Sequence, residues 1–422
     1  VLSPSGLNRF IADCWFSDEP LPAAYTHPAA RALRETGGLS GRMPDPVAID
    51  AYLRVVDVPG AIDQVRCSAR EASPLRRQFL EATADAFAVM WDVGLEMLGR
   101  GPAVPFERSV RAATGESPAP SSPEASKELL ARALDVAGRD NLLEAAEQWR
   151  GERLVQRDAI ASLADIRISE LDRLTLFNVV PHLPASYRPV PRANIRFLPI
   201  EDAWFSGSMN YLGRARRADG LPEYEATYEI NASLEIAIPE FEQLISHEVV
   251  PGHVTTFAFL QHAYVTGTAG FEATVLTMNT RAATLFEGIA NNALLIAHGI
   301  TEISGLDDPD AQVGLLLARL QDEAKNQAAW LTWNEGWREE DVAAALRRDF
   351  LVTAERAVKL AGAWGRHPIL GRMCLPAYLA GTEAVARLRR EYPAEVVLPA
   401  LYGCKGLVDV VTVEDVCRNS QI

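Results

Sequence analysis

The sequence has few cysteines, and their spacing fits neither a disulfide framework nor a cysteine metal site. Five cysteines occur in 422 residues, and none belongs to a CxxC pair. This number and spacing favour free thiols in a reducing compartment. The first ten residues also lack the basic and apolar regions of a secretory signal. We therefore expect a cytoplasmic protein.

Positive charge and long hydrophobic runs are also scarce. Lys and Arg total 41 against 56 Asp and Glu, which gives a formal net charge of −15. A nucleic-acid-binding protein needs a basic surface, so this class is disfavoured. A membrane-spanning helix needs about 18 or more apolar residues in succession, and no such run is present. We expect a small-molecule or short peptide substrate as the partner, with no nucleic acid and no membrane.

Apolar residues recur at spacings of three and four along most of the chain, which is the pattern of amphipathic helices. The segments with this pattern are 76–99, 124–147, 150–178, 238–263, 271–298, 309–332, 338–360 and 376–391. Five prolines between residues 100 and 126 exclude a continuous helix there. We predict a mainly α fold with an N-terminal helical lobe over residues 1–122, which ends in this proline-rich loop. A helical metal-binding catalytic region would follow over residues 123–422.

The pattern changes between residues 180 and 235. A proline-rich stretch ends in a short apolar run near residue 195, and a second β-like run follows at Tyr224–Ile230. Glycines and polar residues lie between the two runs. This arrangement predicts a small antiparallel β element at about 194–232.

One segment, HEVVPGH at 247–253, carries the strongest chemical signal. In the common HExxH pattern, two histidines four residues apart share one face of a helix and bind one zinc ion. Here His253 follows His247 by six residues, which on a straight helix means about 120° of rotation and roughly 9 Å of rise. Both rings could not then reach one ion.

The residues between the two histidines offer a solution. Pro251 cannot donate a backbone hydrogen bond, and Gly252 tolerates unusual backbone angles. A bulge at Val250–Gly252 would bring His253 back to the face of His247. The alternative is a helix end that carries two unrelated surface histidines.

A second segment, EGIANN, provides a third candidate ligand. Glu287 lies 34 residues after His253 in a helical stretch, and zinc hydrolases of the His2Glu type take a carboxylate from a following helix. Asn291 lies one turn further on and could orient Glu287. The alternative for Glu287 is an ordinary solvated acid.

A third segment, at 378–389, places a tyrosine and an arginine on one helical stripe. Tyr378 could stabilise an oxyanion, and Arg389, or Arg387 nearby, could bind a substrate carboxylate. The alternative is a packed helix with its arginines in water.

Together the three segments resemble the DUF885 family of bacterial proteins, which is similar to the M32 carboxypeptidase-like zincins. The family's hallmarks are H-E-x-x-P-G-H, E-G-W-A and a Y-x-x-G segment that ends in L-R, and the match covers about residues 190–410. The resemblance implies a helical zincin-like fold with a small β element beside a central cleft. It also implies that His247, His253 and Glu287 bind the metal and that Glu248 is the general base. Tyr378 and Arg389 would then lie on the substrate side.

The sequence departs from this family where the substrate would lie. The family's E-G-W-A-x-Y-x-E is EGIANNAL here, which puts Asn291 and Asn292 at altered positions, and Trp333 stands where a histidine is usual. We expect a narrowed cleft and a tailored substrate.

These observations predict a zinc-dependent hydrolase that acts on an amide or peptide bond of a small peptide or amino-acid-derived substrate. Zn²⁺ would activate water, with Glu248 as the base. The β-like run could bind an extended substrate, with Tyr228 facing the cleft. Two alternatives remain: a non-haem Fe²⁺ site in a tailoring enzyme of a biosynthetic pathway, and a helical binding protein without catalysis. Metal analysis separates Zn²⁺ from Fe²⁺, and a Glu248→Gln variant separates catalysis from binding.

Overall fold

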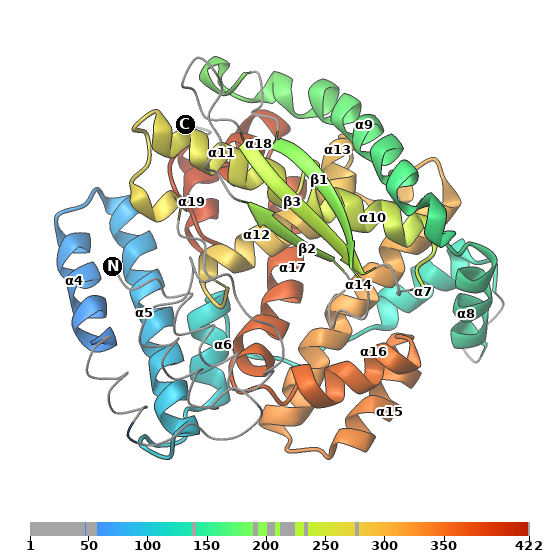
Figure 1. Cartoon of the computed structure of the whole chain (residues 1–422), viewed down its shortest axis with the longest axis horizontal. Helices are drawn as coiled ribbons and strands as arrows, with labels where there is room; N and C mark the ends of the chain where they lie inside the picture. The colour runs from blue at the N-terminus through green and yellow to red at the C-terminus, as the bar shows by residue number, and fades with distance from the viewer. Residues whose placement is uncertain are drawn as a thin grey trace.

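The structure is a computed structural model that describes residues 47, 57–136, 141–188, 193–200, 207–211, 224–231, 235–274 and 278–420. For the three strands and for residues 271 and 274, only the backbone is described. Helices dominate this part of the chain (Figure 1), which confirms the mainly α prediction.

The described residues up to 188 are mainly helical. The α-helices are α4 (Val58–Arg70), α5 (Pro74–Met97), α6 (Phe106–Thr114), α7 (Glu124–Ala133), α8 (Leu142–Glu152) and α9 (Ile160–Asn178). Short 3₁₀ turns are η2 (Arg157–Ala159), η3 (Val180–His182) and η4 (Ala185–Tyr187). The predicted helix over 124–147 is therefore two helices, α7 and α8.

A three-stranded sheet follows, with strands β1 (Ala193–Ile200), β2 (Gly207–Tyr211) and β3 (Tyr224–Asn231) in the order β1-β3-β2. The β2–β3 pairing is antiparallel, but β1 runs parallel to β3. The prediction of an antiparallel element is therefore wrong for β1, and it missed β2 altogether. A parallel pair needs a long crossover, and the chain between β1 and β3 supplies it.

The C-terminal half is again helical. Its α-helices are α10 (Ile238–Glu248), α11 (His253–Val265), α12 (Arg281–Asn291), α13 (Ala293–Ala297), α14 (Pro309–Ala329), α15 (Glu339–Phe350), α16 (Ala354–Lys359), α17 (Leu375–Glu391), α18 (Ala394–Leu401) and α19 (Thr412–Asn419). Short 3₁₀ turns are η5 (Phe271–Thr274) and η6 (Ile303–Gly305). Three π-helical turns are η7 (Trp330–Asn334), η8 (Leu360–Trp364) and η9 (Leu370–Cys374).

Local sequence signals explain where several of these helices begin. The Thr280 hydroxyl accepts a hydrogen bond from the Ala283 amide at the start of α12, and the Asp308 carboxylate accepts one from Asp310 at the start of α14. These are N-cap interactions, which satisfy amide groups that the first turn leaves without partners. The predicted helix over 338–360 ends early because Leu351 adopts a left-handed backbone angle, and Thr353 then caps α16.

The N-terminal helices share a hydrophobic core with a segment near the C-terminus. Val89, Met90 and Val93 of α5 belong to the same buried cluster as Ile369 and Met373. The predicted division at residue 122 stays a prediction, although this shared core joins residues from both sides of it.

Helices α12 and α17 approach each other closely near the centre of the fold. A Cβ placed on Gly288 would lie 2.2 Å from the Gly381 carbonyl oxygen. A Cβ on Gly381 would lie 2.0 Å from the carbonyl oxygen of Thr284. These two glycines therefore let the helix backbones touch, and this contact holds Glu287 and Tyr378 close together.

We predict that Gly288→Ala lowers the free energy of unfolding by about 1–3 kcal/mol or more, because overpacking forces the two backbones apart. The matched control is Gly151→Ala in α8, where a Cβ would meet nothing within 4 Å. That change should stabilise the chain by up to about 1 kcal/mol through helix propensity. Chemical denaturation of both variants measures the difference. Equal stabilities for the two variants would contradict the close helix contact.

Candidate metal centre

The chain between the two histidines breaks one helix into two. Helix α10 ends at Glu248, and α11 begins at His253, so each histidine lies at a helix end. The Gly252 amide donates to the Ser246 carbonyl at 3.0 Å, which folds the chain back on the end of α10. The predicted bulge within one helix is therefore a turn between two helices, at the predicted place.

Close backbone contacts make this turn specific to its sequence. A Cβ on Gly252 would lie 1.8 Å from the His247 carbonyl oxygen, so a larger residue does not fit. Tyr402 lies at the C-terminal end of α18, and its hydroxyl donates to the Pro251 carbonyl at 2.9 Å. The Val250–Pro251 peptide bond is cis. Tyr402 is fully buried and carried no signal in the sequence that pointed to this contact.

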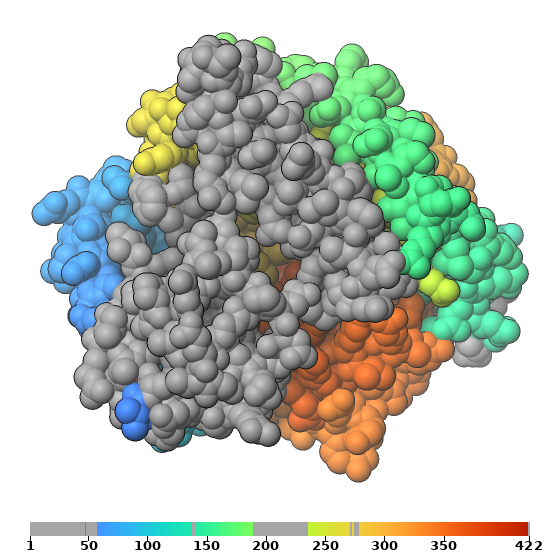
Figure 2. Space-filling view, viewed as in Figure 1, coloured from blue at the N-terminus to red at the C-terminus, as the bar shows by residue number. Residues whose placement is uncertain are grey.

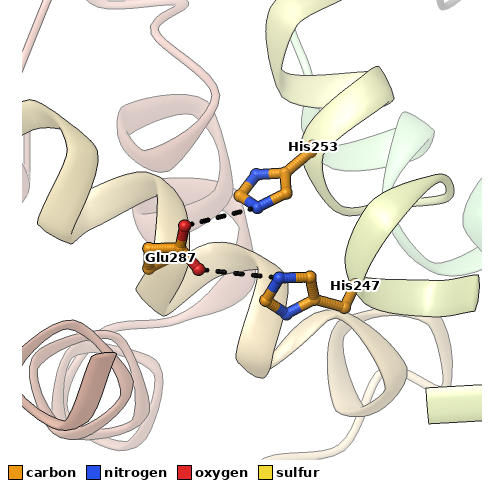
Figure 3. A group of neighbouring side chains, drawn as sticks. All are labelled: His247, His253 and Glu287. Carbon is orange, nitrogen blue, oxygen red and sulfur yellow. Dashed lines mark ion pairs between the residues drawn. The ribbon is translucent and has the colours of Figure 1, made fainter. Parts of the chain in front are cut away.

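The turn brings the two histidines and Glu287 together (Figure 3). His247 Nε2 lies 3.5 Å from Glu287 Oε2, and His253 Nε2 lies 3.7 Å from Glu287 Oε1. The ring centroids are 4.7 Å apart and nearly perpendicular. One donor atom from each residue lies within 4.8 Å of the others. Three residues from three helices thus converge, as the sequence predicted.

Burial dominates the electrostatics of this group. It lowers the pKa of His253 to about 4 and the pKa of His247 well below its usual value. It also raises the pKa of Glu287 to about 7 and, together with the Glu287 charge, raises the pKa of Glu248 to about 8. Neutral imidazoles are the form that binds metal. The Lys325 charge lowers the pKa of both carboxyl groups, but burial still raises both above the usual value, so a further cation would favour their ionised form.

The donor set fits a zinc ion. Two imidazole nitrogens and one carboxylate are the protein ligands of many catalytic zinc sites, which keep a further position open. Among the described residues, buried Glu287 Oε2 has no hydrogen-bond partner, which is costly unless something else binds it. The residues therefore fit the metal.

Asn291 orients a histidine rather than Glu287. Its side chain forms a hydrogen bond with His247 that raises the pKa of that ring, so the amide oxygen accepts from the imidazole. Its Nδ2 donates to Asp322 Oδ2 at 2.8 Å and to Thr382 Oγ1 at 2.8 Å. Because Nε2 of His247 faces Glu287, the amide fixes the ring with Nε2 available for a metal. The sequence predicted that Asn291 would orient Glu287, whereas its side chain contacts His247.

Glu248 and Tyr378 both lie beside the three residues. Glu248 Oε1 is 4.0 Å from His247 Nε2, at the end of α10. The charge of Glu287 and burial raise the pKa of Tyr378 well above its usual value, so the phenol keeps its proton. Tyr378 is thus close enough to Glu287 to sense its charge, and the hydroxyl can donate.

Arg389 and Arg387 do not lie where the sequence predicted. Arg389 is buried and donates to the carbonyl groups of Leu295 and Ile300. Arg387 is exposed and pairs with Glu391 and Glu414 on the surface. Their predicted role as a carboxylate anchor is therefore wrong. The residue spacing correctly placed Tyr378 and Arg389 on one face of α17. It could not predict which part of the fold packs over the C-terminal end of that helix.

Three further residues were predicted to lie on the substrate side of the site. Tyr228 lies in β3 opposite Phe197 and Met209, and its side chain is outside the described features. Asn292 is buried and donates to the Gly288 and Thr382 carbonyls, so it joins two helices rather than lining a cleft. Trp333 donates to the Gly365 carbonyl at 2.7 Å, and nothing described places it against the histidines.

Sequence reasoning missed a buried ion pair beside the site. Lys325 Nζ lies 2.9 Å from Asp322 Oδ1, and Asp322 Oδ2 accepts hydrogen bonds from Asn291 and Thr382. Both residues of the pair are on α14 and are almost fully buried. A Lys three residues after an Asp is common on solvated helix faces, so spacing alone gave no signal.

In Figure 2, atoms with the colours of α12 and α17 are visible near the middle of the face. Among the described residues, no helix is both long and apolar enough to cross a membrane. The four cysteines in the described part of the chain are free thiols. Cytoplasmic location and the expected partners stay predictions.

No family model matches this chain, and no curated protein matches it. The fold is similar to two solved structures. One is described as a candidate lipoprotein from Colwellia psychrerythraea, with a TM-score of 0.53 and 14% identity over 86% of this chain and 69% of that one. The other is a candidate lipoprotein of unknown function from Shewanella oneidensis, with a TM-score of 0.54 and 14% identity over 100% of this chain and 83% of that one. At this identity the likeness concerns the fold alone.

We predict that Asn291→Ala lowers zinc affinity by about 10–100-fold, because His247 loses the partner that orients its ring. Asn326→Ala is the matched control, since the Asn326 amide bonds to Ala119 and Ser121 instead. Competition with a zinc-binding dye measures both affinities. Equal affinities for the two variants would remove Asn291 from the support of the site.

Proposed function

We propose that this chain is a zinc-dependent hydrolase that cleaves an amide or peptide bond in a small peptide or an amino-acid-derived substrate. The observation that carries the proposal is the convergence of His247, His253 and Glu287, with Glu248 beside them. We also propose that the helices form a zincin-like fold, in keeping with the resemblance to the DUF885 family.

Zinc is the metal that this donor set suits best. The site offers two nitrogens and one carboxylate and contains a fourth group, Glu248, which is next to a ligand without being needed as one. A zinc ion at this site would act as a Lewis acid and make water acidic enough to lose a proton near neutral pH. A non-haem Fe²⁺ site would leave Glu248 without a role.

Glu248 and Tyr378 supply the proton chemistry. Glu248 accepts the proton of the attacking water and then gives it to the leaving amine, as a general base and general acid in turn. The Tyr378 hydroxyl donates a hydrogen bond to the carbonyl oxygen of the substrate as negative charge develops there. Glu248 is buried and Tyr378 is partly buried, which strengthens these interactions, because the effective dielectric is lower than in water.

The contacts that hold these residues in place favour a catalytic site over a purely structural metal site. Asn291 and Asp322 hold His247, the contact between Gly288 and Gly381 holds α12 against α17, and a conformationally restricted turn presents His253. Catalytic groups must be held within a fraction of an ångström to be effective. A purely structural metal site does not need a carboxylic acid such as Glu248 next to its ligands.

We predict that the wild-type chain contains about one zinc per molecule and that His247→Ala and His253→Ala each lose it. Each change removes one of three protein ligands, and the two that remain bind weakly. Elemental analysis of untagged protein measures the metal content. Iron in place of zinc would favour the Fe²⁺ alternative, and full zinc content in both variants would contradict the site.

We further predict that Glu248→Gln keeps zinc and fold but slows hydrolysis by about 10²–10⁴-fold, because the amide cannot accept a proton. Glu242→Gln, on the same helix and near Arg167, is the matched control and should keep full activity. The assay is a panel of short peptides and N-acylated amino acids, with zinc content measured in parallel. Near-normal turnover by the Glu248 variant would exclude the proposed mechanism.

A further inference from the structure

Lys325 lies over the face of the Tyr378 ring. The ammonium nitrogen is 3.3 Å from the ring centre, and a cation is attracted to an aromatic face within about 6 Å of that centre. Lys325 is 9% exposed, so little water competes for the ammonium, and exclusion of water strengthens such a contact. The contact joins α14, which carries Lys325, to α17, which carries Tyr378.

Asp322 fixes the position of the ammonium. Lys325 Nζ donates to Asp322 Oδ1 at 2.9 Å, and both residues lie on α14. The other carboxylate oxygen, Oδ2, accepts from Asn291 Nδ2 at 2.8 Å and from Thr382 Oγ1 at 3.1 Å. Asp322 is thus buried with partners for both oxygens on α12, α14 and α17. A buried and hydrogen-bonded network of this kind makes the surrounding structure rigid.

This network bridges the two helices that carry Glu287 and Tyr378. Asn291 is one turn after Glu287 in α12, and Thr382 is one turn after Tyr378 in α17. The Asn291 amide also donates directly to Thr382 Oγ1, at 2.8 Å. The same atoms that hold the ammonium therefore hold α17 against α12, one turn from the proposed zinc ligand and from the tyrosine.

The Tyr378 hydroxyl has to be aimed accurately if it is to stabilise an oxyanion. Rotation about the Cα–Cβ bond moves a tyrosine hydroxyl between separate staggered positions. A misplacement of about 1 Å at a catalytic group can cost roughly 10²-fold in rate. A cation over the ring face holds the ring in one position, and the hydroxyl group itself takes no part in that contact.

We propose that Lys325 is a positioning residue for Tyr378. Held in place by Asp322, the ammonium fixes the ring so that the hydroxyl points to the carbonyl oxygen of the substrate. This inference rests on the proposed function and deepens it, because it names the residues that orient the oxyanion donor. Lys325 touches no reacting atom in this scheme, so it affects turnover only through Tyr378.

The first test is a double-mutant cycle of Lys325→Met and Tyr378→Phe on the full-length, zinc-loaded chain. Methionine keeps most of the side-chain length but carries no charge. We expect Lys325→Met to lower kcat by about 10-fold or more and to change KM by less than about 2-fold. In the Tyr378→Phe background the same change should lower kcat by less than about 2-fold, because no hydroxyl remains to be aimed. The substrate is the short peptide or N-acylated amino acid that wild-type protein hydrolyses fastest.

Two further variants complete this test, and zinc content is measured for every protein. Lys359→Met is the matched control, because Lys359 also pairs with a carboxylate on its own helix, that of Glu355, and it should keep the wild-type kcat. The combined variant Asp322→Asn/Lys325→Met removes both charges of the pair, so that no unpaired carboxylate is left buried. It should lose kcat as Lys325→Met does, and it decides the test if Lys325→Met alone does not fold.

A second measurement follows the ring directly and needs no catalytic activity. 3-Fluorotyrosine is incorporated at position 378 of the full-length chain, and its ¹⁹F NMR signal is recorded. Because an ammonium over the ring changes the electric field at the fluorine, Lys325→Met should shift this signal by more than its linewidth. Lys359→Met should leave the signal in place.

The possible failures separate the two proposals. An unchanged fluorine signal in Lys325→Met, or a wild-type kcat in that variant, would overturn the positioning role. Equal losses of kcat from Lys325→Met with and without the Tyr378 hydroxyl would overturn it too, because Lys325 would then act independently of the ring. A chain that hydrolyses no compound of the panel, but whose fluorine signal shifts in Lys325→Met and not in Lys359→Met, would overturn the proposed function and support the positioning of the ring.

Discussion

The break between α10 and α11 is the constraint on which the rest of the site depends. A six-residue spacing cannot place two histidines on one face of a continuous helix. The chain solves this with a residue that cannot donate its amide and a residue without a Cβ, and the Gly252 position leaves no room for any other side chain. The buried Tyr402 hydroxyl then holds the Pro251 carbonyl. The geometry of the donor atoms thus follows from the turn rather than from either helix.

A second constraint is the burial of two acidic groups whose charge is only partly compensated. Burial alone raises the pKa of a carboxyl group, and here it does so for two neighbouring residues, Glu248 and Glu287. Lys325 offsets part of this effect, but Asp322 already binds the Lys325 ammonium. A divalent cation at the donor atoms would stabilise both ionised carboxylates.

The sequence was informative where the chemistry is local. Adjacent His247 and Glu248, the break at Pro251, and Glu287 on a later helix could be recognised because motif spacing reflects local geometry. Asn291 was identified as a supporting residue, but its target was wrong, because side-chain direction depends on how α12 meets α10. The mainly α character could be predicted from the apolar periodicity. The same periodicity continues across helix ends such as the one at Leu351, so it could not reveal them.

Contacts between distant segments could not be predicted in the same way. Arg389 shares a helical face with Tyr378, yet it is three turns away and binds carbonyl groups that only the tertiary fold brings there. Asp322 and Lys325 belong to no motif, and they contact Asn291, Thr382 and Tyr378 on other helices. The parallel pairing of β1 and β3 depends on a crossover rather than on strand composition.

The most direct test of the account is anomalous diffraction from crystals of the full chain grown with zinc, measured above and below the zinc absorption edge. The account predicts one peak at about 2 Å from a ring nitrogen of each of His247 and His253 and from a Glu287 carboxylate oxygen. A zinc peak only elsewhere on the protein, with these three side chains in the arrangement described, would contradict it.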